Sequence, residues 1–184
     1  MSSDNPHSEP EYLSGDPVAF GELVTRYQHS LFGFLSRMGL SQSLCEEMAQ
    51  ETFLRAWKNR AAYDPDKAAV STWLFTIARN CALNSMARKN IPLAEEIEVE
   101  TLFQSGSSED PANQYVQHQS VVRLRRALST LSVEDREVIA ACYTPDIQNT
   151  SVFLQCSEGA LRTRLSRARA RLSKALERLD LEDE

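Results

Sequence analysis

Residues 157–179 read SEGALRTRLSRARARLSKALERL, and this is the most strongly patterned stretch of the chain. Its apolar residues recur every three or four positions, which is typical of a helix with one buried face. These positions are Leu161, Leu165, Ala168, Leu172, Leu176 and Leu179. Ser157 is a favourable N-cap residue. The sequence therefore predicts a long amphipathic helix that begins directly after Ser157.

The same helix is basic within an acidic chain. Residues 160–178 contain six arginines and Lys174 against one acid, Glu177, whereas the whole chain has 20 basic and 26 acidic residues. A concentrated set of cations, together with the positive end of the helix dipole, favours a nucleic-acid partner. The alternative is a basic helix that is merely solvated on the surface of a bundle.

The composition is that of a globular protein of one medium or two small domains, with 184 residues of which 42% are hydrophobic. There is no run of eighteen apolar residues, and the polar N-terminus lacks the features of a signal peptide. We therefore expect a cytoplasmic protein that does not insert into a membrane.

Catalytic chemistry finds no support in the sequence. It has no Gly-rich phosphate loop, no nucleophile elbow and no spacing of its three histidines that suggests a site. The four cysteines form no C-x-x-C pair and lie far from any histidine, so we expect reduced thiols in or near cores. The expectation is a protein that is not an enzyme and holds neither a metal nor a cofactor.

The segment 91–120 differs in composition from the rest of the chain. It contains six acidic residues, no Lys or Arg, and the turn-rich run QSGSSEDP at 104–111, which predicts an acidic flexible linker. No segment on either side alternates like a strand. We expect an all-α protein of two small, separately folded helical domains, at 14–90 and 121–184, preceded by a polar tail at 1–13.

Three helices are predicted in the first domain. One starts at Asp16-Pro17, the second covers about 41–60, and the third follows the turn at 63–66 and extends from 67 to 94. The second carries several acids on its polar side, whereas the third has four basic residues and no acid. This contrast suggests two partners of opposite charge.

Three ordered motifs carry a resemblance to a known family. EEMAQETFLRAW at 46–57 resembles the E-D-x-x-Q-E-x-F-x-x-A-W pattern in region 2 of the extracytoplasmic-function (ECF, group 4) sigma factors of bacterial RNA polymerase. STWLFTIARN at 71–80 is similar to the T-W-L-x-x-I-A-x-N segment of that domain. LSTLSVEDREV at 128–138 and the segment 159–172 resemble region 4, a helix-turn-helix.

In this family, the second helix of region 2 docks on the clamp helices of the largest subunit of core polymerase. The resemblance implies that role for four matching residues, namely Glu47, Gln50, Glu51 and Arg55. Their charge pattern is compatible with a basic helical partner, although an ordinary solvated helix face would look alike.

The third helix of region 2 reads the melted −10 element as single-stranded DNA. The residues to which the resemblance assigns this contact are Lys67, Arg79, Asn80, Asn84 and Arg88. Their chemistry suits the role, because amides can read base edges while arginines neutralise phosphates and stack on bases. Trp73 lies at the spacing of the apolar face, so we expect it in the core.

Region 4 places its second helix in the major groove of the −35 element. By register, the implied DNA-facing residues are Arg162, Thr163, Arg164, Ser166, Arg167 and Arg171. The preceding helix, expected at 147–155, departs from the pattern because Ser151 and Gln155 stand where the family has alanine and a turn glycine. Gln155 would adopt the turn conformation at a cost of about 1 kcal/mol.

The resemblance implies a sigma factor that binds core RNA polymerase, including the flap of its second subunit, and directs it to the −35 and −10 elements of promoter DNA. It also implies an anti-sigma factor that holds the protein inactive. Two alternatives remain open on the residues alone: a stand-alone helix-turn-helix regulator, which should dimerise on a palindromic site, and a helical adaptor that sequesters a partner protein.

Overall fold

The structure is a computed structural model that describes residues 11–89 and 111–182. Within these ranges every regular element is a helix, which confirms the all-α prediction. The α-helices are α1 (Pro17–Arg37), α2 (Gln42–Asn59), α3 (Val70–Lys89), α4 (Pro111–Ser129), α5 (Val133–Cys142), α6 (Thr150–Phe153) and α7 (Glu158–Glu182). Two short 3-10 helices, η1 (Glu11–Leu13) and η2 (Arg60–Ala62), precede α1 and follow α2.

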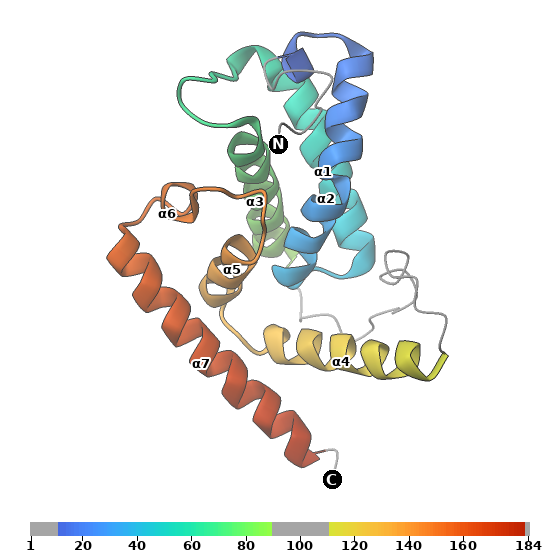
Figure 1. Cartoon of the computed structure of the whole chain (residues 1–184), viewed down its shortest axis with the longest axis vertical. Helices are drawn as coiled ribbons and strands as arrows, with labels where there is room; N and C mark the ends of the chain where they lie inside the picture. The colour runs from blue at the N-terminus through green and yellow to red at the C-terminus, as the bar shows by residue number, and fades with distance from the viewer. Residues whose placement is uncertain (1–10, 90–110, 183–184) are drawn as a thin grey trace, which may run out of the picture.

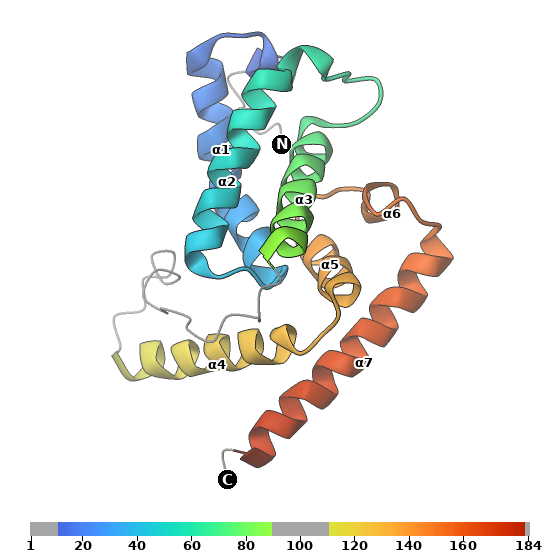
Figure 2. The same cartoon turned by 180° about the vertical axis from the view of Figure 1, so that it is seen from behind.

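Helices α1, α2 and α3 form a bundle in the N-terminal half (Figures 1 and 2). Helix α1 begins where predicted: the Asp16 carboxylate accepts a hydrogen bond from the Val18 amide at 3.0 Å, and Pro17 occupies the first turn. It ends at Arg37, and the nearby Gly39 has a φ of 88°, which lies in the left-handed region. Leu23, Leu31 and Phe34 are fully buried along its inner face.

Helix α3 crosses α2 and α1 and closes the bundle. It starts at Val70, three residues later than predicted, and is described as far as Lys89; residues 90–94 of the predicted helix lie outside the described ranges. Phe75 packs edge-on against Phe34 with the ring centroids 5.5 Å apart. Trp73 is only partly buried and packs against Tyr63, so it lies at the edge of the core and not within it.

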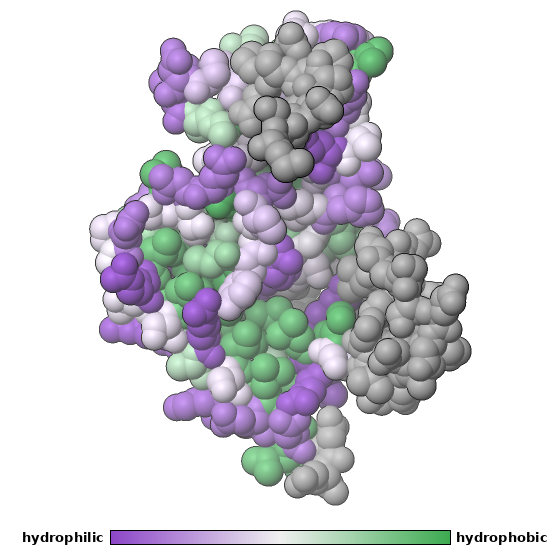
Figure 3. All heavy atoms as spheres, viewed as in Figure 1, coloured by the Kyte–Doolittle hydropathy of each residue, from purple (hydrophilic) through white to green (hydrophobic). Residues whose placement is uncertain are grey.

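The C-terminal half consists of α4 to α7. Helix α7 contacts both α4 and α5, and a second cluster of buried residues joins these three helices. Ala168 and Ala175 are buried on the α7 side of this cluster, with Leu172, Leu176 and Leu179 partly buried beside it. Figure 3 shows apolar side chains where α4 and α7 converge and hydrophilic ones along the outer edge formed by α7. The predicted amphipathic stripe of α7 is therefore confirmed.

Two predicted boundaries are corrected by the structure. Residues 12 and 13 of the expected polar tail are buried, with Tyr12 2% exposed, because they pack against the α1–α3 core. The expected linker at 91–120 is too long at its end, because α4 already begins at Pro111. The remaining residues of the tail and the linker lie outside the described part of the chain.

The two helical domains also pack against each other in this structure. Helix α5 packs on α1, and the main cluster of buried residues includes both α1–α3 and the C-terminal segment 138–154. Phe153 of α6 packs edge-on against Phe34 of α1 with the centroids 6.0 Å apart. The physical reason is that α5 is apolar on two sides, one facing α7 and one facing the N-terminal bundle.

Candidate protein and nucleic-acid interfaces

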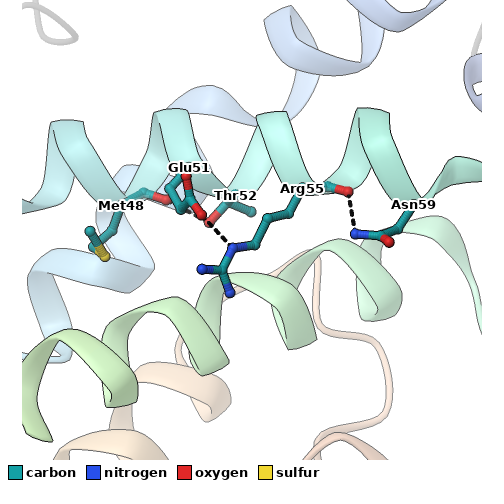
Figure 4. A network of polar contacts seen from close by, with 5 residues as sticks. All are labelled: Met48, Glu51, Thr52, Arg55 and Asn59. Carbon is teal, nitrogen blue, oxygen red and sulfur yellow. Dashed lines mark hydrogen bonds and ion pairs between the residues drawn. The ribbon is translucent and has the colours of Figure 1, made fainter.

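The polar side of α2 presents the four residues that the sequence assigns to polymerase binding. Glu47 and Gln50 are exposed, whereas Glu51 and Arg55 are half-exposed and paired. The Nε of Arg55 donates to Oε1 of Glu51 at 2.5 Å, and this hydrogen bond raises the pKa of Arg55 (Figure 4). An exposed pair of this kind contributes at most about 1 kcal/mol to stability. Its main effect is to hold both side chains in one orientation.

An open hollow of about 590 Å³ lies between α2 and α3. Its lining includes all four of these α2 residues and two residues assigned to −10 DNA, Asn84 and Arg88. The α2 side of the hollow is acidic at Glu47 and Glu51, whereas the α3 side is cationic at Arg88. The structure thus brings two predicted sites, one for protein and one for DNA, to one continuous surface.

Leu54 also lines this hollow and is missing from the sequence-based set. Its side chain is 46% exposed, which is unusual for a leucine in a helix that has a buried face. Its position, three residues after Glu51 and four after Gln50, places it on the same face of α2. The helical spacing alone could therefore have identified it.

The residues predicted to bind −10 DNA do not all share one surface. Asn80, Asn84 and Arg88 are exposed at spacings of four along α3, and the two amides make no side-chain hydrogen bond within the described ranges. Lys67 precedes α3 and pairs with Asp64 at 2.9 Å. Arg79 points elsewhere, because its Nε donates to the carboxylate of Glu137 in α5.

The basic helix α7 begins as predicted, since the Ser157 hydroxyl accepts a hydrogen bond from the Ala160 amide at 3.2 Å. Four of the residues assigned to −35 DNA are exposed and make no ion pair within the described ranges, namely Arg162, Thr163, Ser166 and Arg167. Arg171 donates to Asp135 at 2.5 Å, and Arg164 lies 3.9 Å from Glu137.

Asp135 and Glu137 are therefore functional candidates that the sequence did not reveal. Both lie on α5 and are buried, and their partners are 27 to 58 residues away in the chain. Helix α5 carries three acids, Glu134, Asp135 and Glu137, and no local signal distinguishes the two buried ones from the exposed Glu134.

The first helix of the helix-turn-helix is shorter than predicted. Helix α6 is a single turn, Thr150–Phe153, where a helix over 147–155 was expected. Asn149 caps it by accepting from the Val152 amide at 3.2 Å. Gln155 has a φ of 51° and is the one non-glycine residue with positive φ in the described ranges, so the predicted glycine-like turn position is confirmed.

Replacing Gln155 by Gly is expected to stabilise the protein by up to about 1 kcal/mol, because glycine adopts the left-handed conformation without steric cost. Urea denaturation followed by circular dichroism measures this gain. The matched control is Gln28→Gly, at an exposed position within α1, which should destabilise the protein by about 1 kcal/mol. A loss of stability in Gln155→Gly would contradict the assignment of this strain.

The cysteines occupy apolar surroundings. Burial raises the pKa of the Cys45 thiol to about 12, and burial also raises the pKa of Cys81 and Cys142. A raised pKa lowers the thiolate fraction and with it the reactivity of the thiol. Across residues 11–89 and 111–182, no His, Cys, Asp and Glu side chains gather into a metal-binding group. Nor is any helix in these ranges long and apolar enough to cross a membrane.

Comparisons with known proteins agree with this geometry. Residues 23–90 match the family model described as Sigma-70 region 2. The chain is 33% identical over 165 residues to the ECF RNA polymerase sigma factor RpoE of Cereibacter sphaeroides, covering 86% of this chain and 88% of that protein. The chain belongs to the ECF sigma factors.

Further relatives and solved structures support the same assignment. This ECF sigma factor is 31% identical over 171 residues to SigM of Bacillus subtilis, covering 91% of the chain and all of SigM. It aligns with CnrH, solved in complex with the cytosolic domain of CnrY, at 25% identity and a TM-score of 0.64, over 91% and 93% of the two chains. RpoE from Bartonella quintana, solved with the anti-sigma factor NepR, shares the fold at 22% identity and a TM-score of 0.66, over 86% and 96%.

Proposed function

We propose that this ECF sigma factor binds core RNA polymerase through the polar face of α2 and directs it to promoters. The observation that carries the proposal is the hollow between α2 and α3, where the acidic residues of α2 and the amide and cation of α3 share one surface. A basic helical surface of the polymerase would cover the α2 side. Melted −10 DNA would then lie along Asn80, Asn84 and Arg88 of α3.

The −35 contact is assigned to the exposed face of α7. Arg162, Thr163, Ser166 and Arg167 lie within its first three turns, where a recognition helix presents side chains to the major groove. Helix α6 is a single turn, so it offers few groups that could contact the DNA backbone. We infer that −35 recognition depends mainly on α7, and that the polymerase supplies the positioning that α6 does not.

An anti-sigma factor is the second partner that we propose. CnrH and the Bartonella RpoE were each solved with a bound regulator, CnrY and NepR respectively. This chain has a fold of the same kind, and its polymerase-facing hollow is open to solvent. A regulator that covered the hollow would exclude the polymerase by simple competition.

Run-off transcription tests the proposed function. Core RNA polymerase from a bacterium would be incubated with fragmented genomic DNA of the source organism, with and without the sigma factor. We expect discrete new transcripts that disappear with Gln50→Ala or Asn80→Ala. The matched controls are Gln28→Ala and Asn59→Ala, exposed residues outside the hollow, which should leave the transcripts intact.

Binding to core polymerase and to palindromic duplex DNA, measured beside run-off transcription, separates the alternatives. A protein that binds palindromic duplex DNA as a dimer and ignores the polymerase would be a stand-alone regulator. A protein that binds core polymerase and yields no transcripts would be an adaptor or inhibitor. Either outcome would overturn the proposal.

A further inference from the structure

Three arginines from three helices meet at the C-terminal end of α1. Arg37 is the last residue of α1, and Nη2 of Arg125 from α4 donates to the Ser36 hydroxyl at 3.1 Å. The guanidinium of Arg136 from α5 lies against Gly39, which follows Ser36 by three residues. We call Arg37, Arg125 and Arg136 the arginine cluster.

Arg136 is the most deeply buried member of the cluster. It is 4% exposed, its Nε is buried without a hydrogen-bond partner, and it forms no ion pair within the described ranges. The Nε of Arg37 is also buried without a partner, and its Nη2 donates to the Thr144 hydroxyl at 2.9 Å. Across residues 11–89 and 111–182, the side chains of the cluster therefore hydrogen bond only to uncharged hydroxyl groups.

The acidic side chains of α5 do not neutralise the cluster. Asp135 and Glu137 are bonded to arginines of α7 and α3, and Asp146, which follows α5, accepts from a hydroxyl of α1. Burial lowers the pKa of Arg136, and the exposed Glu134 offsets this effect only in part. Burial likewise lowers the pKa of the other two arginines. In the described part of the chain, no carboxylate is bonded to any of the three.

The positive charge of the cluster requires a counter-charge. An arginine cannot relieve the cost of burial by losing its proton, because its pKa stays above about 12 in proteins. A buried charge without a partner is strongly destabilising. The carbonyl end of α1 attracts a cation, but the carbonyl groups of Phe34, Leu35 and Ser36 already accept backbone hydrogen bonds. An anion from solution would supply the balance that the protein does not.

We propose that the arginine cluster is a binding site for a small phosphate-bearing anion, with Arg136 as its principal ligand. A guanidinium presents paired, planar N–H donors that match the oxygens of a phosphate group. The ligand must be small, because Arg136 at 4% exposure leaves no room for a nucleic-acid strand. The site is distinct from the exposed arginines of α7 that the proposed function assigns to DNA, so the inference goes beyond that function.

Isothermal titration calorimetry on the full chain tests the site with two probes, inorganic pyrophosphate and ATP, at constant ionic strength in sodium chloride. We expect one ligand to bind per chain. Equal affinities would indicate a site for the phosphate groups alone, and tighter binding of ATP would indicate a nucleotide site; both results support the proposal. Absence of any binding that depends on Arg136 overturns it.

Variants of Arg136 separate this site from the rest of the basic surface. Arg136→Met removes the charge and should weaken binding by about 30-fold or more, whereas Arg136→Lys keeps the charge without the planar fork and should weaken it by about tenfold. Arg126→Met on α4 and Arg167→Met on α7 remove exposed arginines and should bind like the wild type. If Arg167→Met abolishes binding and Arg136→Met does not, the anion binds to α7 and the proposal is overturned.

Thermal unfolding provides an independent measurement. A probe at 100 times its Kd should raise the Tm of the wild type by about 5 °C or more through mass action. Arg136→Met should lose this shift, and in chloride alone it should be at least as stable as the wild type, because it removes an unpaired buried charge. Lower stability in chloride with the full shift retained would overturn the proposal.

Arg136→Lys keeps the test decisive if Arg136→Met folds poorly, because it retains the positive charge at the same position. A wild-type affinity in Arg136→Lys and a wild-type Tm shift would then contradict the role of the guanidinium. Because neither calorimetry nor thermal unfolding uses polymerase or promoter DNA, failure of the anion site and failure of run-off transcription remain distinguishable.

Discussion

Replacing Leu54 by Arg is expected to weaken binding to core RNA polymerase by about 30-fold or more and to leave the fold intact. Leu54 is 46% exposed, so the substitution disturbs little of the core. It lines the hollow with Glu47, Gln50 and Glu51, and a charge introduced where the partner would bury an apolar side chain costs about 2 kcal/mol or more. The new cation would also repel the basic surface proposed for the partner.

Fluorescence anisotropy with labelled sigma factor and core polymerase, in the absence of DNA, measures this effect. Leu181→Arg is the matched control, because Leu181 is 75% exposed in the last turn of α7 and lies outside the hollow. Both variants should retain the helical circular dichroism of the wild type. Equal affinities for the two variants would show that the polymerase does not cover the hollow.

Replacing Phe34 by Ala is expected to destabilise the protein by about 3–5 kcal/mol, which is a large part of the stability of a typical domain. Phe34 is fully buried, and its ring packs edge-on against Phe75 of α3 and Phe153 of α6. The cavity would therefore open where the N-terminal bundle meets the C-terminal half. Both the bundle and the contact between the halves should weaken.

Urea denaturation followed by circular dichroism gives the loss in free energy of unfolding. Phe32→Ala provides the comparison, since Phe32 lies on the same helix and is only partly buried. We expect its loss to be markedly smaller. Similar losses of unfolding free energy for the two variants would show that the packing of Phe34 contributes no more to stability than that of Phe32.

The local features of the fold could be predicted from the sequence because they depend on neighbouring residues. Asp16-Pro17 and Ser157 specify helix starts through capping, and both starts are observed. The turn after α6 needs a left-handed residue, and Gln155 supplies it. Pro111, which follows Asp110, carries the same signal as Pro17, so the early start of α4 could also have been predicted.

Other features depend on residues that lie far apart in the chain, and no periodic pattern of the sequence predicts them. The Arg79–Glu137 bond joins positions 58 residues apart, and either residue alone looks like a solvated charge. The burial of Tyr12 likewise depends on the bundle that it packs against. The sequence predicted which arginines suit DNA, but the pairing of three of them with α5 requires the tertiary structure.

Gly39, in the turn that follows α1, faces the C-terminal half. A methyl group at this position would overlap the guanidinium of Arg136, which is buried against the turn between α1 and α2. The absence of a side chain at residue 39 and the long side chain at residue 136 therefore form a size-matched pair across the two halves. In relatives whose two halves pack in the same way, a larger residue at position 39 should be accompanied by a shorter one at position 136. The two positions should therefore covary.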